Sequence, residues 1–321
     1  MTAARWEDIM KSHLLAAVAV GAVFVAGSAN AQQLRLMTGP QGGSWYPLGG
    51  AIQNIVENNV DGVTVQVLPG AGIANVKAVE AGKAQMGFAN SVSTVDAIQG
   101  NEPFTEKATN VCNVATLYPQ YFQVIALKDS GIDTPADLAG KAAAVQPKGN
   151  TGEAITAHLL KAIGTNYDAL PRVNHGSYTD AVSLMKDGNA EWFTLGTTVP
   201  AGAVMDLASA RDIKVVPIEG EALEKMQELN PGYKPITIKA GSYPGQDEDV
   251  QTIGYATHLI AQCDLDPDVV YNVLKNISEH VGDLSAIAKA MSGATPEDMG
   301  RDIGVPLHDG AKKFYDEAGA S

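Results

Sequence analysis

The stretch that decides the fold runs from Leu34 to Asn90 and reads LRLMTGPQGGSWYPLGGAIQNIVENNVDGVTVQVLPGAGIANVKAVEAGKAQMGFAN. Short apolar runs in it predict three strands, at 34–38, 63–68 and 86–89. Between them, apolar side chains recur with helical spacing at 44–58 and 73–80. This alternation is typical of a mostly parallel sheet with helices on both faces.

A second series of strands and helices follows. Strands are predicted at 122–127, 142–146, 190–194, 213–218, 236–238 and 252–261, and helices at 134–138, 153–163, 268–281, 284–291 and 310–318. The pattern predicts an α/β protein of two α/β domains, with residues 32–126 and 236–321 in domain I and residues 127–235 in domain II. Ligands of open α/β sheets bind beyond the carboxyl ends of strands, so the predicted site is the cleft between the domains.

The first 31 residues have the features of a secretory signal peptide. The segment 14–26 is apolar throughout, and the small residues Ala-Asn-Ala at 29–31 follow it. Its length of about 13 residues is below the roughly 20 that span a bilayer. We therefore predict cleavage after Ala31 and a mature protein in the periplasm. A start at Met10 in place of Met1 would remove two acidic residues that are unusual in such a leader.

Composition excludes several kinds of function. Twenty-two basic and 36 acidic residues give a net charge of −14, so no basic surface is expected for nucleic acid. Cys112 and Cys263 are too few for a cysteine-based metal site. They either form a disulfide, as an oxidising compartment permits, or remain two separate buried thiols. The histidines of the mature chain are scattered without metal-ligand spacing, and neither a metal nor a cofactor is predicted: His158, His175, His258, His280 and His308.

The first candidate ligand-binding element lies between the first predicted strand and helix. Gly43 lets the backbone approach a ligand closely, and Ser44 is predicted to cap the helix. The N–H groups at a helix N-terminus form a ready site for an anion. Trp45 and Tyr46 would provide an apolar wall with polar tips. The alternative is an ordinary turn with two aromatic side chains packed beneath it.

A matching element occurs in predicted domain II. It comprises Lys148, Gly149, Asn150, Thr151 and Gly152. Asn150 and Glu153 have the spacing of a capping box at the start of a helix. Lys148 is either a ligand for a carboxylate or a solvated lysine at a turn. Two helix N-termini, one from each domain, would suit a small acid.

Other polar residues follow predicted strands and are further candidates for ligand contact: Asn90, Ser91, Tyr118, Thr194 and Thr197. The alternatives are helix capping for Ser91 and a place in the core for Tyr118.

Enzyme signatures are incomplete. The segment 42–46 has Tyr46 where a nucleophile elbow needs glycine. The segment 70–75 has Asn75 in place of the third glycine of a dinucleotide-binding turn. No acid–base pair stands out, so we predict no catalytic residues and no enzyme activity.

Four segments resemble the TAXI family, the extracytoplasmic solute receptors of TRAP transporters. They are GGSWYPLGG at 42–50, LYP at 117–119, DSGI at 129–132 and GSYPGQDEDV at 241–250. The resemblance implies a periplasmic binding protein of type II-like fold that closes on its ligand and delivers it to an ion-driven membrane permease. It also implies glutamate, glutamine or a related small carboxylate as the ligand.

By the same resemblance, ligand contacts would come from these positions: Ser44, Trp45, Tyr46, Asn90, Ser91, Tyr118 and 149–152. The chain departs from the family pattern at 148–152 and at 192–197, both on the predicted ligand side. Two rivals share some of these features, namely the receptor of an ATP-driven importer and a periplasmic enzyme. The expected partners are the small solute and the permease subunits, with the receptor itself a monomer.

Overall fold

The computed structural model describes residues 32–39 and 44–320. Gln32–Ser321 forms one compact unit of the chain. The predicted signal peptide, its cleavage site after Ala31, the two candidate start residues and Gly43 lie outside the described residues.

The first three strands form as predicted. They are β1 (Gln32–Met37), β2 (Val63–Leu68) and β3 (Met86–Asn90), and β1 lies parallel to both of the others. Leu34 and Leu36 point to one face of β1 and are almost fully buried, which is the alternation that a strand imposes. Two helices connect these strands, α2 (Trp45–Asn59) and α3 (Gly72–Glu80), and α4 (Ser91–Gln99) follows β3.

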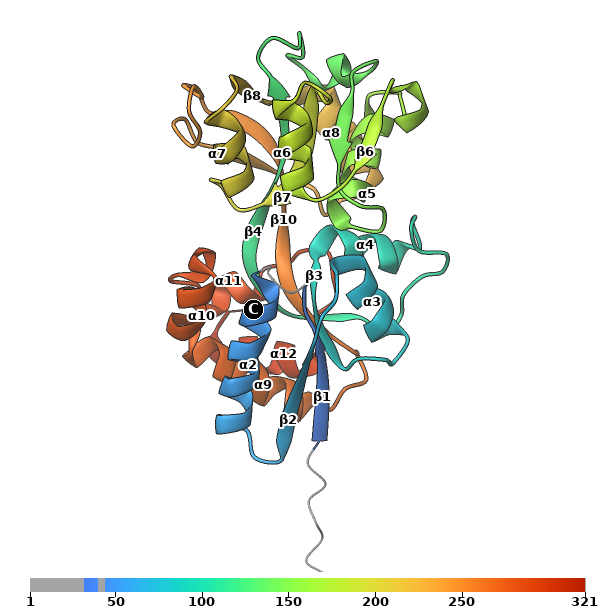
Figure 1. Ribbon diagram of the computed structural model, residues 1–321. Helices are drawn as coiled ribbons and strands as arrows, with labels where there is room; N and C mark the ends of the chain where they lie inside the picture. The colour runs from blue at the N-terminus through green and yellow to red at the C-terminus, as the bar shows by residue number, and fades with distance from the viewer. Residues whose placement is uncertain (1–31, 40–43, 321) are drawn as a thin grey trace, which may run out of the picture. The chain divides into compact units, whose positions relative to one another are not determined.

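Two long strands change the expected character of the sheet. β4 (Cys112–Leu127) and β10 (Val250–Ala261) run side by side and antiparallel through the middle of the fold (Figure 1). The sheet has ten strands in the order β2-β1-β3-β10-β4-β7-β5-β6, with β8 on β4 and β9 on β10. The prediction of a mostly parallel sheet is therefore wrong. The two long strands also pair antiparallel with their other neighbours. β10 pairs with β3 and β9, and β4 pairs with β7 and β8.

The remaining strands and helices of the middle of the chain are η2 (Pro135–Leu138), β5 (Ala143–Val145), α5 (Thr151–Ala162), η3 (Tyr167–Ala169), β6 (Val173–His175), α6 (Tyr178–Lys186), β7 (Trp192–Thr197), α7 (Gly202–Ala208), β8 (Ile213–Val216), α8 (Gly220–Leu229) and β9 (Lys234–Ile238). After β10 come α9 (Pro267–Glu279), α10 (Val281–Ile287), η4 (Lys289–Met291), α11 (Pro296–Gly300) and α12 (Asp309–Ala318). None of the helices in the described ranges has the length and hydropathy needed to cross a bilayer.

Apolar side chains gather in separate clusters. One contains Leu34 of β1 and Val273 of α9, and Figure 1 shows α2, α9 and α12 in this part of the fold. Trp192 and Phe193, neighbours on β7, belong to two different clusters because successive side chains face opposite sides of a sheet. Helices therefore cover both faces of the sheet around β7, as predicted for an α/β fold.

The close approach of α9 and α12 depends on Gly310. A Cβ atom at this position would lie 2.1 Å from the backbone oxygen of Pro267. We expect Gly310→Ala to lower the free energy of unfolding by about 2–3 kcal/mol, because the two backbones must separate. Urea denaturation measures this loss. Gly282→Ala is the matched control, since Gly282 is also the second residue of its helix and no heavy atom lies within 4 Å of its would-be Cβ. An equal effect of the two substitutions would contradict the prediction.

Candidate functional site

A cavity of about 430 Å³ collects residues from both predicted domains. Seven of the predicted ligand-binding residues line it: Ser44, Trp45, Asn90, Asn150, Thr151, Gly152 and Thr197. The cavity thus brings together the starts of α2 and α5, which are about a hundred residues apart in the sequence.

Other predicted site residues lie elsewhere. Ser91 and Tyr118 line a second cavity, of about 390 Å³. The Thr194 hydroxyl is buried and forms a hydrogen bond with Thr156, 2.8 Å between the oxygens. Tyr46, Lys148 and Gly149 line neither cavity, and Lys148 is exposed.

The helix starts differ from their predicted capping. The Asn150–Glu153 capping box is not formed, and the side chain of Asn150 makes no capping hydrogen bond. Ser44 does not cap α2 either, because its φ of −65° and ψ of −26° are helical, whereas a cap residue needs an extended backbone. Among the described residues, no side chain accepts a hydrogen bond from the first N–H groups of either helix. These N–H groups remain available to an anion.

A third helix start at the cavity is already capped. Ser177 and Tyr178, at the beginning of α6, line the cavity. Asp180 and Ser177 form a reciprocal capping box, in which the Asp180 carboxylate accepts hydrogen bonds from the Ser177 N–H and hydroxyl. These bonds hold the pKa of Asp180 below its usual value. The start of α6 is thus satisfied by its own chain and differs in this from α2 and α5.

Aromatic side chains form part of the cavity wall. The Trp45 Nε1–H donates to the Tyr118 hydroxyl at 3.1 Å, so Tyr118 orients Trp45 from behind without lining the same cavity. Tyr178 and Tyr255 are lining residues that the sequence analysis missed. The Tyr178 hydroxyl is fixed by the backbone N–H and carbonyl of Gly196, both at 3.1 Å. Burial raises the pKa of both tyrosines, so both phenols stay protonated at neutral pH.

Two glutamines were also missed. Gln120 lies within β4 and Gln146 follows β5, and both are more than nine-tenths buried. Gln120 Nε2 donates to Thr257 at 2.8 Å. Gln120 Oε1, Gln146 Nε2 and Asn90 Oδ1 are buried atoms without a hydrogen-bond partner in the described part of the chain. The signal in the sequence was the place of Gln146 at the end of a predicted strand.

Gly152 makes room for one of these amides. A Cβ atom on Gly152 would lie 2.0 Å from Gln146 Nε2. The amide of Gln146 therefore lies directly against the start of α5, at the same cavity. Next to it, the Thr151 hydroxyl forms a hydrogen bond with the Ser93 hydroxyl of α4 at 2.9 Å, which ties α5 to the other predicted domain.

Metal chemistry has no support in the part of the chain that the structure describes, where no group of three His, Cys, Asp or Glu side chains could hold an ion. The cavity instead offers helix N–H groups, hydroxyls, carboxamides and aromatic faces. Such groups bind a polar organic molecule by hydrogen bonds and van der Waals contact.

Residues 36–319 match the family model described as the NMT1-like family. The chain belongs to this family. Among solved structures it is similar to XAC2383 from Xanthomonas citri bound to ATP, with 12% identity over 90% of this chain and 96% of that chain and a TM-score of 0.55. A protein from Bordetella bronchiseptica RB50 shows 18% identity over 91% of this chain and 90% of that chain, with a TM-score of 0.50.

A further match is the periplasmic aliphatic sulphonate binding protein SsuA from Escherichia coli, with 13% identity over 89% of this chain and 83% of that chain and a TM-score of 0.45. The fold of this NMT1-like protein is a mixed α/β fold, as predicted, and XAC2383 has a similar fold. The structural matches to XAC2383 and the Bordetella protein show similarity of fold alone, so the ligand is argued from the chemistry of the cavity.

Proposed function

We propose that this NMT1-like protein is an extracytoplasmic solute receptor. Its cleft, between domain I (32–126 with 236–321) and domain II (127–235), captures a small carboxylate or an acidic amino acid of the glutamate type. The observation that carries the proposal is the meeting of two uncapped helix starts, α2 and α5, at one cavity. A single carboxylate there can accept hydrogen bonds from N–H groups of both domains.

The same geometry explains how binding would favour a closed form. A ligand that touches Ser44–Trp45 and Asn150–Gly152 together gains contacts only when the two domains are close. It therefore shifts the population toward the closed conformation. The Thr151–Ser93 hydrogen bond is a further direct contact between the predicted domains.

The partner of the closed form is a membrane permease, and the resemblance at 241–250 favours a TRAP-type permease over an ATP-driven importer. In the structure this segment forms the turn between β9 and β10. The Tyr243 hydroxyl accepts a hydrogen bond from the N–H of Ala201 at 2.9 Å and donates to Gln123 Oε1. Tyr243 does not line the cavity, so the support from this segment concerns the family rather than the solute. No turnover of the bound solute is expected.

The test of the proposed function is a thermal melting screen of the mature protein against small carboxylates, amino acids and neutral sugars. The melting temperature should rise in the presence of a compound that carries a carboxylate, because a ligand that binds the folded state stabilises it by mass action. A response to neutral sugars alone, or to none of the compounds, would contradict the proposal.

Gly152→Ala tests the place of the ligand at the start of α5. The new methyl group must displace the Gln146 amide, which lies at the cavity. We expect the affinity for the carboxylate found in the screen to fall by about tenfold or more, measured by calorimetry. Gly202→Ala is the control, since Gly202 opens α7 and no heavy atom lies within 4 Å of its would-be Cβ. Unchanged affinity in Gly152→Ala would remove the start of α5 from the site.

A further inference from the structure

The residues that line the ligand cavity carry no ionisable cation or carboxylate. In the described ranges, their side chains are hydroxyls, carboxamides, aromatic rings and small apolar groups. Lys148, the predicted partner for a carboxylate, is exposed and does not line the cavity.

One carboxylate lies directly beside the cavity. Asp180 caps α6 directly behind the lining residues Gly176 and Ser177, and the would-be Cβ of Gly176 lies 3.1 Å from Asp180 Oδ2. Its lowered pKa keeps this carboxylate ionised at neutral pH. An anion in the cavity therefore meets no cationic side chain among the described lining residues. It can accept hydrogen bonds from the starts of α2 and α5, and it lies near the negative charge of Asp180.

At the cavity, three carboxamides each have one polar atom without a hydrogen-bond partner among the residues that the structure describes. They are Asn90, Gln120 and Gln146, and the last two are more than nine-tenths buried. A carboxamide presents either its carbonyl oxygen or its NH₂ group to a ligand. It can therefore satisfy neutral N–H, O–H or C=O groups, but it supplies no opposite charge to a second carboxylate, whose burial without a cation is costly.

We propose that the cleft selects a solute with a single carboxylate and a neutral polar group in place of a second one, and that it discriminates against dicarboxylates of the same length, the acidic amino acids included. Asn90, Gln120 and Gln146 are the residues that determine this specificity. The inference rests on the proposed function, and it narrows the ligand class that the sequence predicts. The carboxylate binds at the uncapped helix starts, while the carboxamides bind the neutral end of the solute.

The experiment compares diacids with their monoamides of equal length. The pairs are glutamate and glutamine, aspartate and asparagine, glutarate and glutaramate, and succinate and succinamate, each titrated into the mature protein by calorimetry at pH 7.5. In every pair that binds, we expect the monoamide to bind at least about tenfold more tightly. Equal or tighter binding of the diacids would overturn the inference and leave the proposed function intact. Absence of binding by all eight compounds would overturn both.

A charge-changing variant tests the role of Gln120 itself. Gln120→Glu keeps the shape of the side chain and adds a negative charge, so it should widen the preference for the monoamide by a further tenfold or so. Gln99→Glu is the matched control, because it adds the same charge at an exposed position on α4. A monoamide-to-diacid ratio that is the same in both variants would show that Gln120 does not face the ligand and would overturn its assignment.

Discussion

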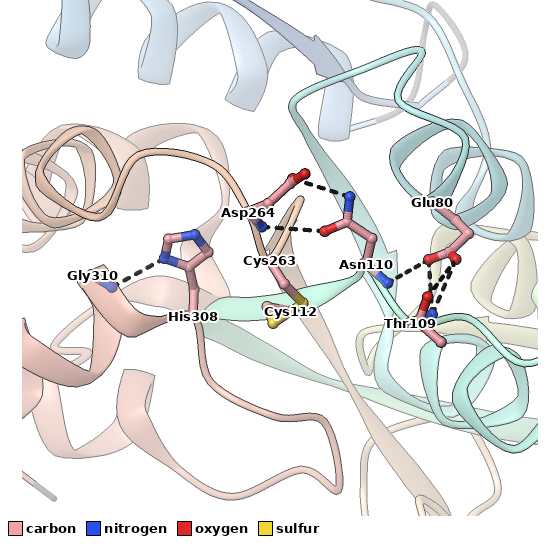
Figure 2. Close-up of a disulfide and its surroundings, with 8 residues drawn as sticks. All are labelled: Glu80, Thr109, Asn110, Cys112, Cys263, Asp264, His308 and Gly310. Carbon is pink, nitrogen blue, oxygen red and sulfur yellow. Dashed lines mark hydrogen bonds between the residues drawn. A yellow bond between two sulfur atoms is a disulfide. The ribbon is translucent and has the colours of Figure 1, made fainter.

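Loss of the Cys112–Cys263 disulfide is expected to lower the free energy of unfolding by about 3–5 kcal/mol. The sequence left open whether these cysteines pair, and the structure shows the bond, with Cα atoms 5.0 Å apart (Figure 2). Cys112 begins β4 and Cys263 follows the end of β10, so the bond joins the two long strands where their antiparallel ladder ends. It closes a loop with a sequence separation of 151 residues. Such a long loop gives a large reduction in the entropy of the unfolded chain.

Polar contacts beside the disulfide limit how far the strand ends can move without it. Asn110 and Asp264 exchange hydrogen bonds of 3.0 and 3.2 Å, and the Glu80 carboxylate accepts from the backbone of Thr109 and Asn110 (Figure 2). The cross-link therefore acts mainly on the unfolded state. Neither cysteine lines the ligand cavity, so ligand affinity should be unchanged.

The measurement is denaturation of the double variant Cys112→Ala/Cys263→Ala, compared with wild type in the presence and absence of a reductant. Reduced wild type keeps both side chains and loses only the bond, so it should unfold at nearly the same denaturant concentration as the double variant. If reduction leaves the midpoint of wild type unchanged, the disulfide is not the source of stability.

Strands and helices could be predicted from the sequence where the pattern of apolar residues and the turn residues that bound it agree. Residues 63–68 form a strand with the bounds predicted, because Val63 and Val65 alternate with exposed residues. The sequence predicted only the part of β4 from residue 122 onward, because Pro119 and the polar Gln120 are unusual in a strand interior. Pro119 is exposed there and pairs with Ala256, and the ladder shifts register nearby. α6 was missed although Ser177 and Asp180 carry the capping-box spacing that marks a helix start.

The candidate site was predictable in part, for a physical reason. The helix starts at 44 and 150 are local features, and their glycine-rich turns mark them in the sequence. Which side chains remain unpartnered is decided by tertiary packing, so the role of Gln120 could not be predicted from its neighbours. The same holds for the lack of a cationic side chain among the described lining residues, because Lys148 is next to the site in the sequence but is exposed to solvent in the fold.

The stability of the protein is expected to depend on pH through His258, which is fully buried in β10. Its Nε2 lies 2.9 Å from the Thr94 hydroxyl and its Nδ1 lies 3.0 Å from Asn113 Oδ1. The neutral ring fits both, with Nδ1–H donating to Asn113 and Nε2 accepting from Thr94. Burial lowers the pKa of His258 from 6.5 to about 3. Between pH 6.5 and about 3, His258 is therefore protonated in the unfolded state and neutral in the folded state.

Because the folded pKa is depressed, the contribution of His258 to stability is present above pH 6.5 and is lost progressively as the pH falls toward 3. A shift of this size corresponds to roughly 5 kcal/mol over the whole window. Asp96 has the opposite sign, since burial raises its pKa from 3.8 to about 6 and its contribution is lost as the pH rises through 6. Comparing wild type with His258→Gln isolates the contribution of His258, because both proteins contain Asp96.

Urea denaturation of both proteins at intervals from pH 7.5 to pH 4 gives the slope of the unfolding free energy against pH. Wild type should lose more stability on acidification than His258→Gln, whatever the absolute stability of the variant at neutral pH. If the substitution prevents folding, the ring signals of His258 in the NMR spectrum of wild type provide the test. They should not titrate above pH 4 in the folded protein, and a midpoint near 6.5 would show that the buried ring accepts a proton.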